Sequence, residues 1–195
     1  MKHVLLLTAL LLVGCASNET DQKAPRMGEG AEVGPGGEAL APYPFTPEQL
    51  RATYKDGTEL IFRVSVLGQP AVIQRMQFGG ADAEGVTVLV KQESVEGIPG
   101  RDLMNKRSTW KELQEHARFS AVGTARFRER VRTSGAEWDC WVYVVAGPEG
   151  STTSFSFADL LPGPPVLLEQ SKDGETILRM ELIDIITPGG DLPSH

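Results

Sequence analysis

Alternation of apolar and polar side chains with a period of two dominates the chain from Thr58 to Ile186, interrupted by turns that contain glycine or proline. Such alternation is typical of β-strands with one buried face. It predicts about eight strands, over residues 58–67, 71–78, 85–93, 125–132, 137–146, 151–158, 166–171 and 175–186. Because most connections are tight turns, neighbouring strands should pair antiparallel, and a sheet of this size seldom stays flat and open. We therefore expect a mainly β (α+β) domain with a curved antiparallel sheet, half-barrel or barrel-like.

Two short helices are predicted to accompany the sheet. Thr46 and Pro47 form a helix start, with the threonine as N-cap and the proline at the first helical position. This helix should end near Tyr54, before a glycine-containing turn. Thr109 and Glu112 have the spacing of a capping box, which predicts the second helix.

The composition allows one globular domain and excludes several classes of protein. The chain has 195 residues, of which 41% are hydrophobic and 23% charged. At roughly 150 residues per domain, this is enough for one core and too little for two. The apolar fraction is too high for a wholly disordered chain, and a formal net charge of -7 is not that of a nucleic-acid binder. Two cysteines in this length exclude a disulfide scaffold.

The N-terminus has the pattern of an export signal. After the basic start Met1-Lys2-His3, residues 4–13 form an apolar run interrupted only by Thr8. As a helix this run spans about 15 Å, half of a ~30 Å hydrocarbon core, so it is too short to cross a membrane. Its length fits the hydrophobic region of a signal peptide.

The motif Leu12-Val13-Gly14-Cys15 resembles the lipobox of bacterial lipoproteins. The resemblance implies cleavage before Cys15 and a lipid on its thiol, which would hold the protein at a membrane. In lipoproteins of two-membrane bacteria, an aspartate after the cysteine favours retention at the inner membrane. Ala16 at this position implies the outer membrane, with the domain in the periplasm. The alternative is an ordinary signal peptide with a chance cysteine.

Four segments follow from these patterns. Residues 1–14 are the signal peptide, and residues 15–42 are the lipidated cysteine and a flexible linker rich in glycine, proline and acidic residues. Residues 43–187 are the single β-rich domain, and residues 188–195 are a disordered tail.

Candidate catalytic groups are scarce. His3 would leave with the signal peptide and His195 is the last residue, so only His116 belongs to the predicted domain. No metal-ligand spacing, nucleophile motif or phosphate-binding loop is present, and the sequence predicts no metal, no cofactor and no enzyme. An envelope enzyme with a carboxylate-based site stays open as the alternative, because carboxylates that meet only in space leave no sequence signal.

Two predicted strands carry distinctive side chains. Alternation along residues 125–132 places four arginines on one face: Arg126, Arg128, Arg130 and Arg132. They form either a solvated face, partly neutralised by acids such as Glu137 or Asp139 on the next strand, or a contact site for an anion, a lipid headgroup or a partner. The strand 137–146 is apolar on both faces, which predicts a central strand and a buried, unreactive Cys140.

The domain resembles uncharacterised β-rich envelope lipoproteins in three features: its tryptophan-rich strand, the aromatic segment 155–158 with the proline-rich loop 161–165, and a hairpin at Asp173-Gly174. Its layout is similar to that of the lipoprotein carrier and receptor folds of the periplasm. The resemblance implies a non-enzymatic module that binds an envelope partner or an apolar ligand. Six apolar strand positions would either fill a core, as protein interiors normally do, or line a hollow: Phe62, Val64, Phe78, Trp138, Phe155 and Phe157.

Overall fold

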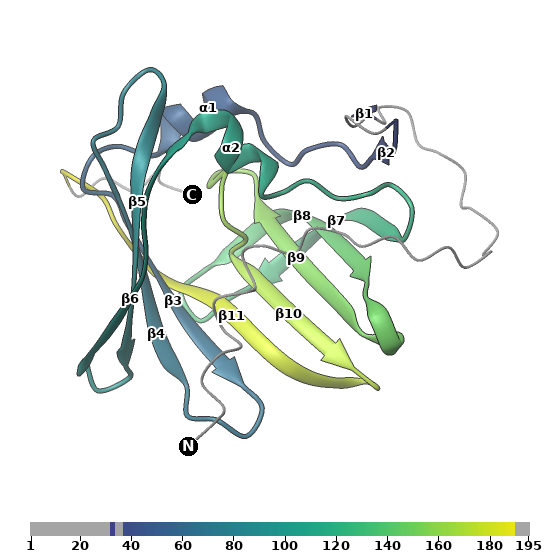
Figure 1. The fold of residues 1–195 in the computed structure, drawn as a ribbon. Coiled ribbons are helices and arrows are strands. Elements are labelled where there is room, and N and C mark those ends of the chain that lie inside the picture. Colours follow the sequence, from purple (N-terminus) through teal and green to yellow (C-terminus); the bar gives the residue numbers. More distant parts are fainter. Residues whose placement is uncertain (1–31, 34–36, 190–195) are drawn as a thin grey trace.

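A computed structural model of the chain describes residues 32–33 and 37–189. The predicted signal peptide, Cys15 and the last six residues, 190–195, lie outside this part. Its main feature is a strongly curved antiparallel sheet with two short helices against its concave side (Figure 1). The prediction of a mainly β fold with a curved antiparallel sheet is confirmed, and the sheet stays open, so the fold is a half-barrel.

The sheet has nine strands, in the spatial order β6-β5-β4-β3-β11-β10-β9-β8-β7. Their bounds are β3 (Glu59–Val66), β4 (Val72–Gly79), β5 (Gly85–Ser94), β6 (Pro99–Thr109), β7 (Thr124–Arg132), β8 (Glu137–Ala146), β9 (Thr152–Ala158), β10 (Leu167–Lys172) and β11 (Glu175–Ile186). A separate pair, β1 (Glu32–Val33) and β2 (Ala39–Leu40), precedes them.

The topology consists of two meanders that meet in the middle of the sheet. Strands β3 to β6 and strands β7 to β11 each pair in chain order, and β3 pairs with β11, with Phe62 opposite Leu182. The segment between β6 and β7 carries the chain from one edge of the sheet to the other (Figure 1). Irregular pairing at Gln170/Ser171, at Leu182/Asp184 and on β5 adds local twist. In the described part of the chain, β6 and β7 are the free edges of this sheet.

Strand β6 is the strand of the large sheet that was not predicted from the sequence. It begins with Pro99-Gly100, and most of its side chains are exposed on both faces. An edge strand of this kind has no buried face, so it lacks the apolar alternation that marks the other strands.

The two helices begin at the predicted caps. In α1 (Pro47–Thr53) the side chain of Thr46 accepts from the backbone N–H of Gln49, whose side chain accepts from the backbone N–H of Thr46. The same reciprocal pair joins Thr109 and Glu112 at the start of α2 (Trp110–Glu115). Both helices lie at the end of the sheet where β3 begins. Helix α1 precedes β3 in the chain, and α2 follows β6, which ends at the same end of the sheet.

Aromatic side chains fill the space between the helices and the sheet. Tyr54, at the end of α1, stacks on Phe78 of β4 with ring centroids 4.1 Å apart. Phe119, which follows α2, contacts Tyr143 of β8 and Phe155 of β9 at 5.1 Å and 4.9 Å. The concave side at this end is therefore a packed core rather than an opening.

Packing begins upstream of Tyr43, where the domain was expected to start. Leu40 and Ala41 are buried. The N–H of Ala41 donates to the carbonyl of Phe119 at 2.9 Å, and the hydroxyl of Tyr143 donates to the carbonyl of Pro42. These contacts hold the last residues of the predicted linker against the aromatic core.

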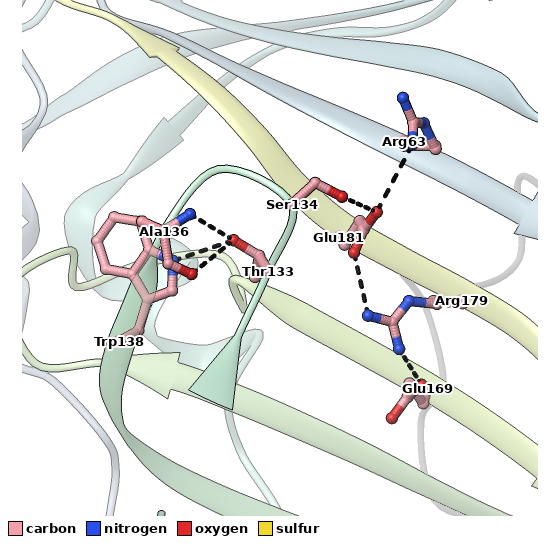
Figure 2. Close-up of polar contacts among 8 residues, drawn as sticks. All are labelled: Arg63, Thr133, Ser134, Ala136, Trp138, Glu169, Arg179 and Glu181. Atoms are coloured by element: carbon pink, nitrogen blue, oxygen red, sulfur yellow. Dashed lines mark hydrogen bonds and ion pairs between the residues drawn. The ribbon is translucent and has the colours of Figure 1, made fainter. Parts of the chain in front are cut away.

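A side-chain hydrogen bond holds the turn between β7 and β8 to strand β11. Figure 2 shows Ser134 in this turn beside Glu181, to which its hydroxyl donates at 2.7 Å. Glu181 is only 8% exposed and also accepts a hydrogen bond from Arg179 at 3.0 Å. Arg63 forms a longer ion pair with the same carboxylate, at 4.0 Å. Burial favours a higher pKa for Glu181, but these hydrogen bonds and positive charges outweigh it, and the pKa of this carboxyl is lowered.

Candidate functional site

The four arginines predicted on one strand form a row along the free edge of the sheet. Strand β7 pairs with β8 over its whole length, and the register places each arginine opposite a side chain that lies on the same face. The opposed pairs are Arg126 with Tyr143, Arg128 with Trp141, Arg130 with Asp139 and Arg132 with Glu137. We refer to these four arginines as the arginine row.

Two members of the row pair with the acids opposite them. Arg130 donates through Nε to Oδ1 of Asp139 at 3.1 Å, and Arg132 donates through Nε to Oε1 of Glu137 at 2.8 Å. These pairs agree with the first of the two interpretations of the row, a solvated face that is partly neutralised by acids of the next strand. The arginine side chains remain 69% and 80% exposed, and ion pairs so open to water contribute little to stability.

Arg128 pairs with a carboxylate from another strand. Its two Nη groups donate to the two carboxylate oxygens of Asp159, which follows β9, and the Nη1 contact is 2.7 Å. Asp159 is held there because its N–H donates to the carbonyl of Asp139 at 3.0 Å. The sequence analysis did not find Asp159, and a separation of 31 positions from Arg128 leaves no local signal for it.

Arg126 differs from the other three arginines. Its guanidinium carbon lies 3.5 Å from the centroid of the Trp141 ring and 5.6 Å from that of Tyr143. Its Nε is buried and has no hydrogen-bond partner within the described residues. Aromatic faces attract a cation without neutralising it, so no carboxylate among the described residues offsets the positive charge of Arg126.

A hollow of about 220 Å³ lies beside the row, lined by Glu137, Trp138, Asp139, Ala158, Asp159 and Leu160. It brings three carboxylates together, and each of them is paired with an arginine of the row. Carboxyl pairs that act in acid–base catalysis need one member held neutral. The hydrogen bond and charge of Arg132 instead lower the pKa of Glu137. The hollow therefore has the chemistry of an ionic surface.

A second, shallower hollow of about 490 Å³ lies over β4, β5 and β6. Its walls carry amide, hydroxyl and apolar groups and no charged side chain: Gly57, Gln77, Phe78, Gly79, Thr87, Leu89 and Asn105. Its polar side-chain groups are the amides of Gln77 and Asn105 and the hydroxyl of Thr87.

The other residues singled out in the sequence lie apart from the row. Cys140 is free and 0% exposed, which confirms its predicted burial. Its strand was predicted to be central and covered on both faces, and β8 lies inside the sheet, between β7 and β9. Its two faces are both apolar because Cys140 is buried on one side while Tyr143 packs against Phe119 on the other. His116 is exposed at the end of α2.

The apolar strand positions that were candidates for lining a hollow are part of the core. Phe155 is half-buried and packs against both apolar clusters of the domain. The other five positions are buried: Phe62, Val64, Phe78, Trp138 and Phe157. Five of these positions therefore fill the concave side, whereas Trp138 lies on the opposite face of β8, the face of Cys140.

Among residues 32–33 and 37–189, no group of histidine, cysteine, aspartate and glutamate side chains is arranged to hold a metal ion. In the same part of the chain, no helix has the length and apolar character needed to span a membrane.

Two solved structures align with this fold at low sequence identity. The complex structure of Pseudomonas aeruginosa MucA/MucB aligns with a TM-score of 0.49 and 10% identity, over 75% of this chain and 56% of that chain. A crystal structure of MucB aligns with a TM-score of 0.47 and 12% identity, over 75% and 57%. The chain thus spans a little over half the length of these proteins, and similarity at this level carries no functional argument. No family model and no curated protein matches the sequence.

Proposed function

We propose that the protein is a non-enzymatic interaction module of the bacterial envelope. In this proposal a lipid on Cys15 anchors the chain to the outer membrane, and the domain lies in the periplasm, where the arginine row contacts an acidic envelope partner. Support for the anchor comes from the lipobox-like motif and from Ala16 after the cysteine.

The observation that carries the binding role is the state of Arg126. A cation that is held on Trp141 without a carboxylate partner is positioned in advance for an anionic group. Its neighbours Arg128, Arg130 and Arg132 continue the row, each paired with one carboxylate, and their side chains are 46%, 69% and 80% exposed. Arginine is well suited to such a contact because its planar fork binds carboxylates with defined geometry.

A macromolecular partner fits the structure better than an apolar guest. The six positions that would have lined a ligand hollow are in the packed core, and the hollow beside the arginine row contains three carboxylates. The hollow over β4, β5 and β6 is shallow and has amide and hydroxyl groups among its apolar walls. An apolar ligand site is usually a preformed concave pocket with mainly apolar walls. We therefore assign the function to the surface at β7 rather than to the interior of the half-barrel.

Crosslinking in living cells tests the binding role. A photo-crosslinking amino acid at position 130, in the arginine row, should give a discrete protein adduct in the native membrane fraction. The same amino acid at position 101 on β6, the opposite edge, should give none. Loss of the adduct on Arg126→Gln would support the assignment. No protein adduct at position 130, or equal adducts at both edges, would refute it.

Lipid labelling tests the anchor independently. Cys15→Ala should abolish incorporation of labelled fatty acid and release the protein from the membrane fraction, because acylation supplies the membrane affinity. Cys140→Ala is the matched control and should leave labelling unchanged. Persistent labelling of the Cys15 variant would contradict the lipoprotein assignment without affecting the crosslinking result.

A further inference from the structure

The outer edge of β7 has free main-chain groups beside the arginine row. Strand β7 pairs with β8 from Thr124↔Val145 to Arg132↔Glu137, and the described residues form no strand on its other side. In an antiparallel pair, every second residue of an edge strand turns its N–H and C=O away from the sheet. These groups form a template to which another extended chain can add.

The charges of the two edge strands determine which extended chains can pair with them. Strand β7 carries four arginines and one acid, Glu129, and the other edge strand, β6, carries Arg101, Lys106 and Arg107 with one acid, Asp102. Both free edges are therefore basic in a chain with a net charge of -7. Like charges that face each other across two strands are destabilising, which disfavours edge-to-edge pairing of two copies of this chain.

The arginines can bind a second carboxylate without giving up the first. A guanidinium has five N–H donors. Arg130 uses only Nε on Asp139, and Arg128 uses only its two Nη groups on Asp159. The internal acids come from β8 and from the end of β9, so they reach the row from inside the sheet. A strand at the free edge would approach from the opposite side.

We propose that the free edge of β7 binds an extended acidic segment of an envelope protein by antiparallel strand addition. This inference rests on the proposed function and names the chemistry of its partner. Carboxylates at alternate positions lie opposite the four arginines at the cross-strand distance of ~5 Å. The intervening side chains lie on the other face, where an apolar residue covers Phe127, which is 43% exposed.

An acidic strand fits this edge better than an anionic membrane does. Attraction to a lipid surface depends on the basic residues that face it, without nearby acids to offset them. Here Glu137, Asp139 and Asp159 accompany the four arginines on the same face, so the net charge that a flat surface would meet is small. An added strand instead places one carboxylate beside each arginine, and it also forms hydrogen bonds with the free main-chain groups of β7.

Short labelled peptides test the proposal on the full chain purified in detergent. The probe has the sequence Glu-Thr-Glu-Thr-Glu-Phe-Glu-Thr, which places a glutamate opposite each arginine and the phenylalanine opposite Phe127. Fluorescence anisotropy should show binding, and replacement of all glutamates by glutamine should weaken it by about tenfold or more. Equal binding of both peptides would overturn the proposal.

Methylation of peptide nitrogens tests strand addition itself. One version carries N-methyl groups on the glutamates, and the other carries them on the threonines and the phenylalanine. Because only one of these sets faces β7, one version should lose binding by about tenfold and the other should retain it. Equal retention by both versions would overturn strand addition and leave the acidic partner of the proposed function in place.

Matched variants locate the site. R130Q/R132Q on β7 and R101Q/K106Q on β6 change the net charge equally, and only the first should weaken peptide binding. Equal weakening by both variants would refute the site at β7 and the proposed function together.

Vesicles that contain phosphatidylglycerol serve as the competing probe. Vesicle binding that depends on Arg130 and Arg132, without peptide binding, would replace the proposal by membrane contact.

Discussion

The guanidinium carbon of Arg126 lies 3.5 Å from the centroid of the Trp141 ring, across the β7–β8 pair. The other arginines of β7 have carboxylates as partners, whereas Arg126 has aromatic rings. Position in the strand explains this difference, because the side chain opposite Arg126 is Tyr143 and the next one along β8 on the same face is Trp141. The row is thus neutralised at one end and cationic at the other.

Arg126→Met should lower the free energy of unfolding by about 1 kcal/mol, because it keeps the aliphatic stem and removes the cation from the ring face. Urea unfolding followed by tryptophan fluorescence measures the loss. Arg130→Met is the matched control on the same strand, and its exposed ion pair predicts a loss below about 0.5 kcal/mol. A larger loss for Arg130 than for Arg126 would show that the contact with Trp141 is not stabilising.

Glu181→Gln should destabilise the protein by about 1–3 kcal/mol, because Arg63 and Arg179 lose the buried charge that they face. The effect should depend on pH. A carboxyl with a lowered pKa in the folded state contributes stability that is complete above its ordinary value of 4.5 and lost as the pH falls through the lowered value. The wild-type chain should therefore lose more stability than Glu181→Gln on acidification from about pH 6 to pH 3.

Unfolding by urea across this pH range measures the difference. Glu175→Gln on the same strand is the control, since Glu175 is exposed at the start of β11. Its acid dependence should match that of the wild-type chain. Parallel curves for the wild-type chain and Glu181→Gln would mean that Glu181 does not contribute to acid sensitivity.

Local patterns in the sequence predicted most of the fold because they reflect burial. The strand at 137–146 was predicted with the bounds observed for β8, and the capping box of Thr109 and Glu112 was predicted as it is observed at the start of α2. Strand β6 was not predicted because its exposed side chains follow no apolar pattern. The position of β8 beside an edge strand was not predicted either, since burial on both faces says nothing about the number of strands on either side.

The candidate site was only half predictable. A period of two is enough to place the arginines on one face, and Glu137 follows in the next strand of the hairpin. The contact of Arg128 with Asp159 depends on where β9 ends, and the free edge depends on the pairing of β3 with β11. Both are long-range features, and a strand's own residues do not encode its neighbours.

Tyr54→Phe should raise the free energy of unfolding by about 1 kcal/mol, because it removes a buried hydroxyl that lacks a partner within the described residues. Tyr54 is 1% exposed, and burial raises the pKa of its phenol. Tyr143→Phe is the matched control. Its hydroxyl donates to Pro42, so its loss should cost about 1 kcal/mol. The midpoint temperatures of thermal unfolding of the two variants should therefore shift in opposite directions. Shifts of the same sign would contradict the different hydrogen-bonding states of the two hydroxyls.

Cys140 should react slowly with a thiol reagent in the native protein and fast after denaturation. Its side chain is 0% exposed, and burial raises the pKa of its thiol to about 12, so both access and the reactive thiolate are lacking near neutral pH. The Cys15→Ala chain carries this thiol alone, which makes the rate unambiguous. The native rate should rise with urea in parallel with unfolding, because reaction requires opening of the β8 region. Equal rates in the folded and denatured chain would show that the thiol is accessible, and the packing of β8 against the core would then be incorrect.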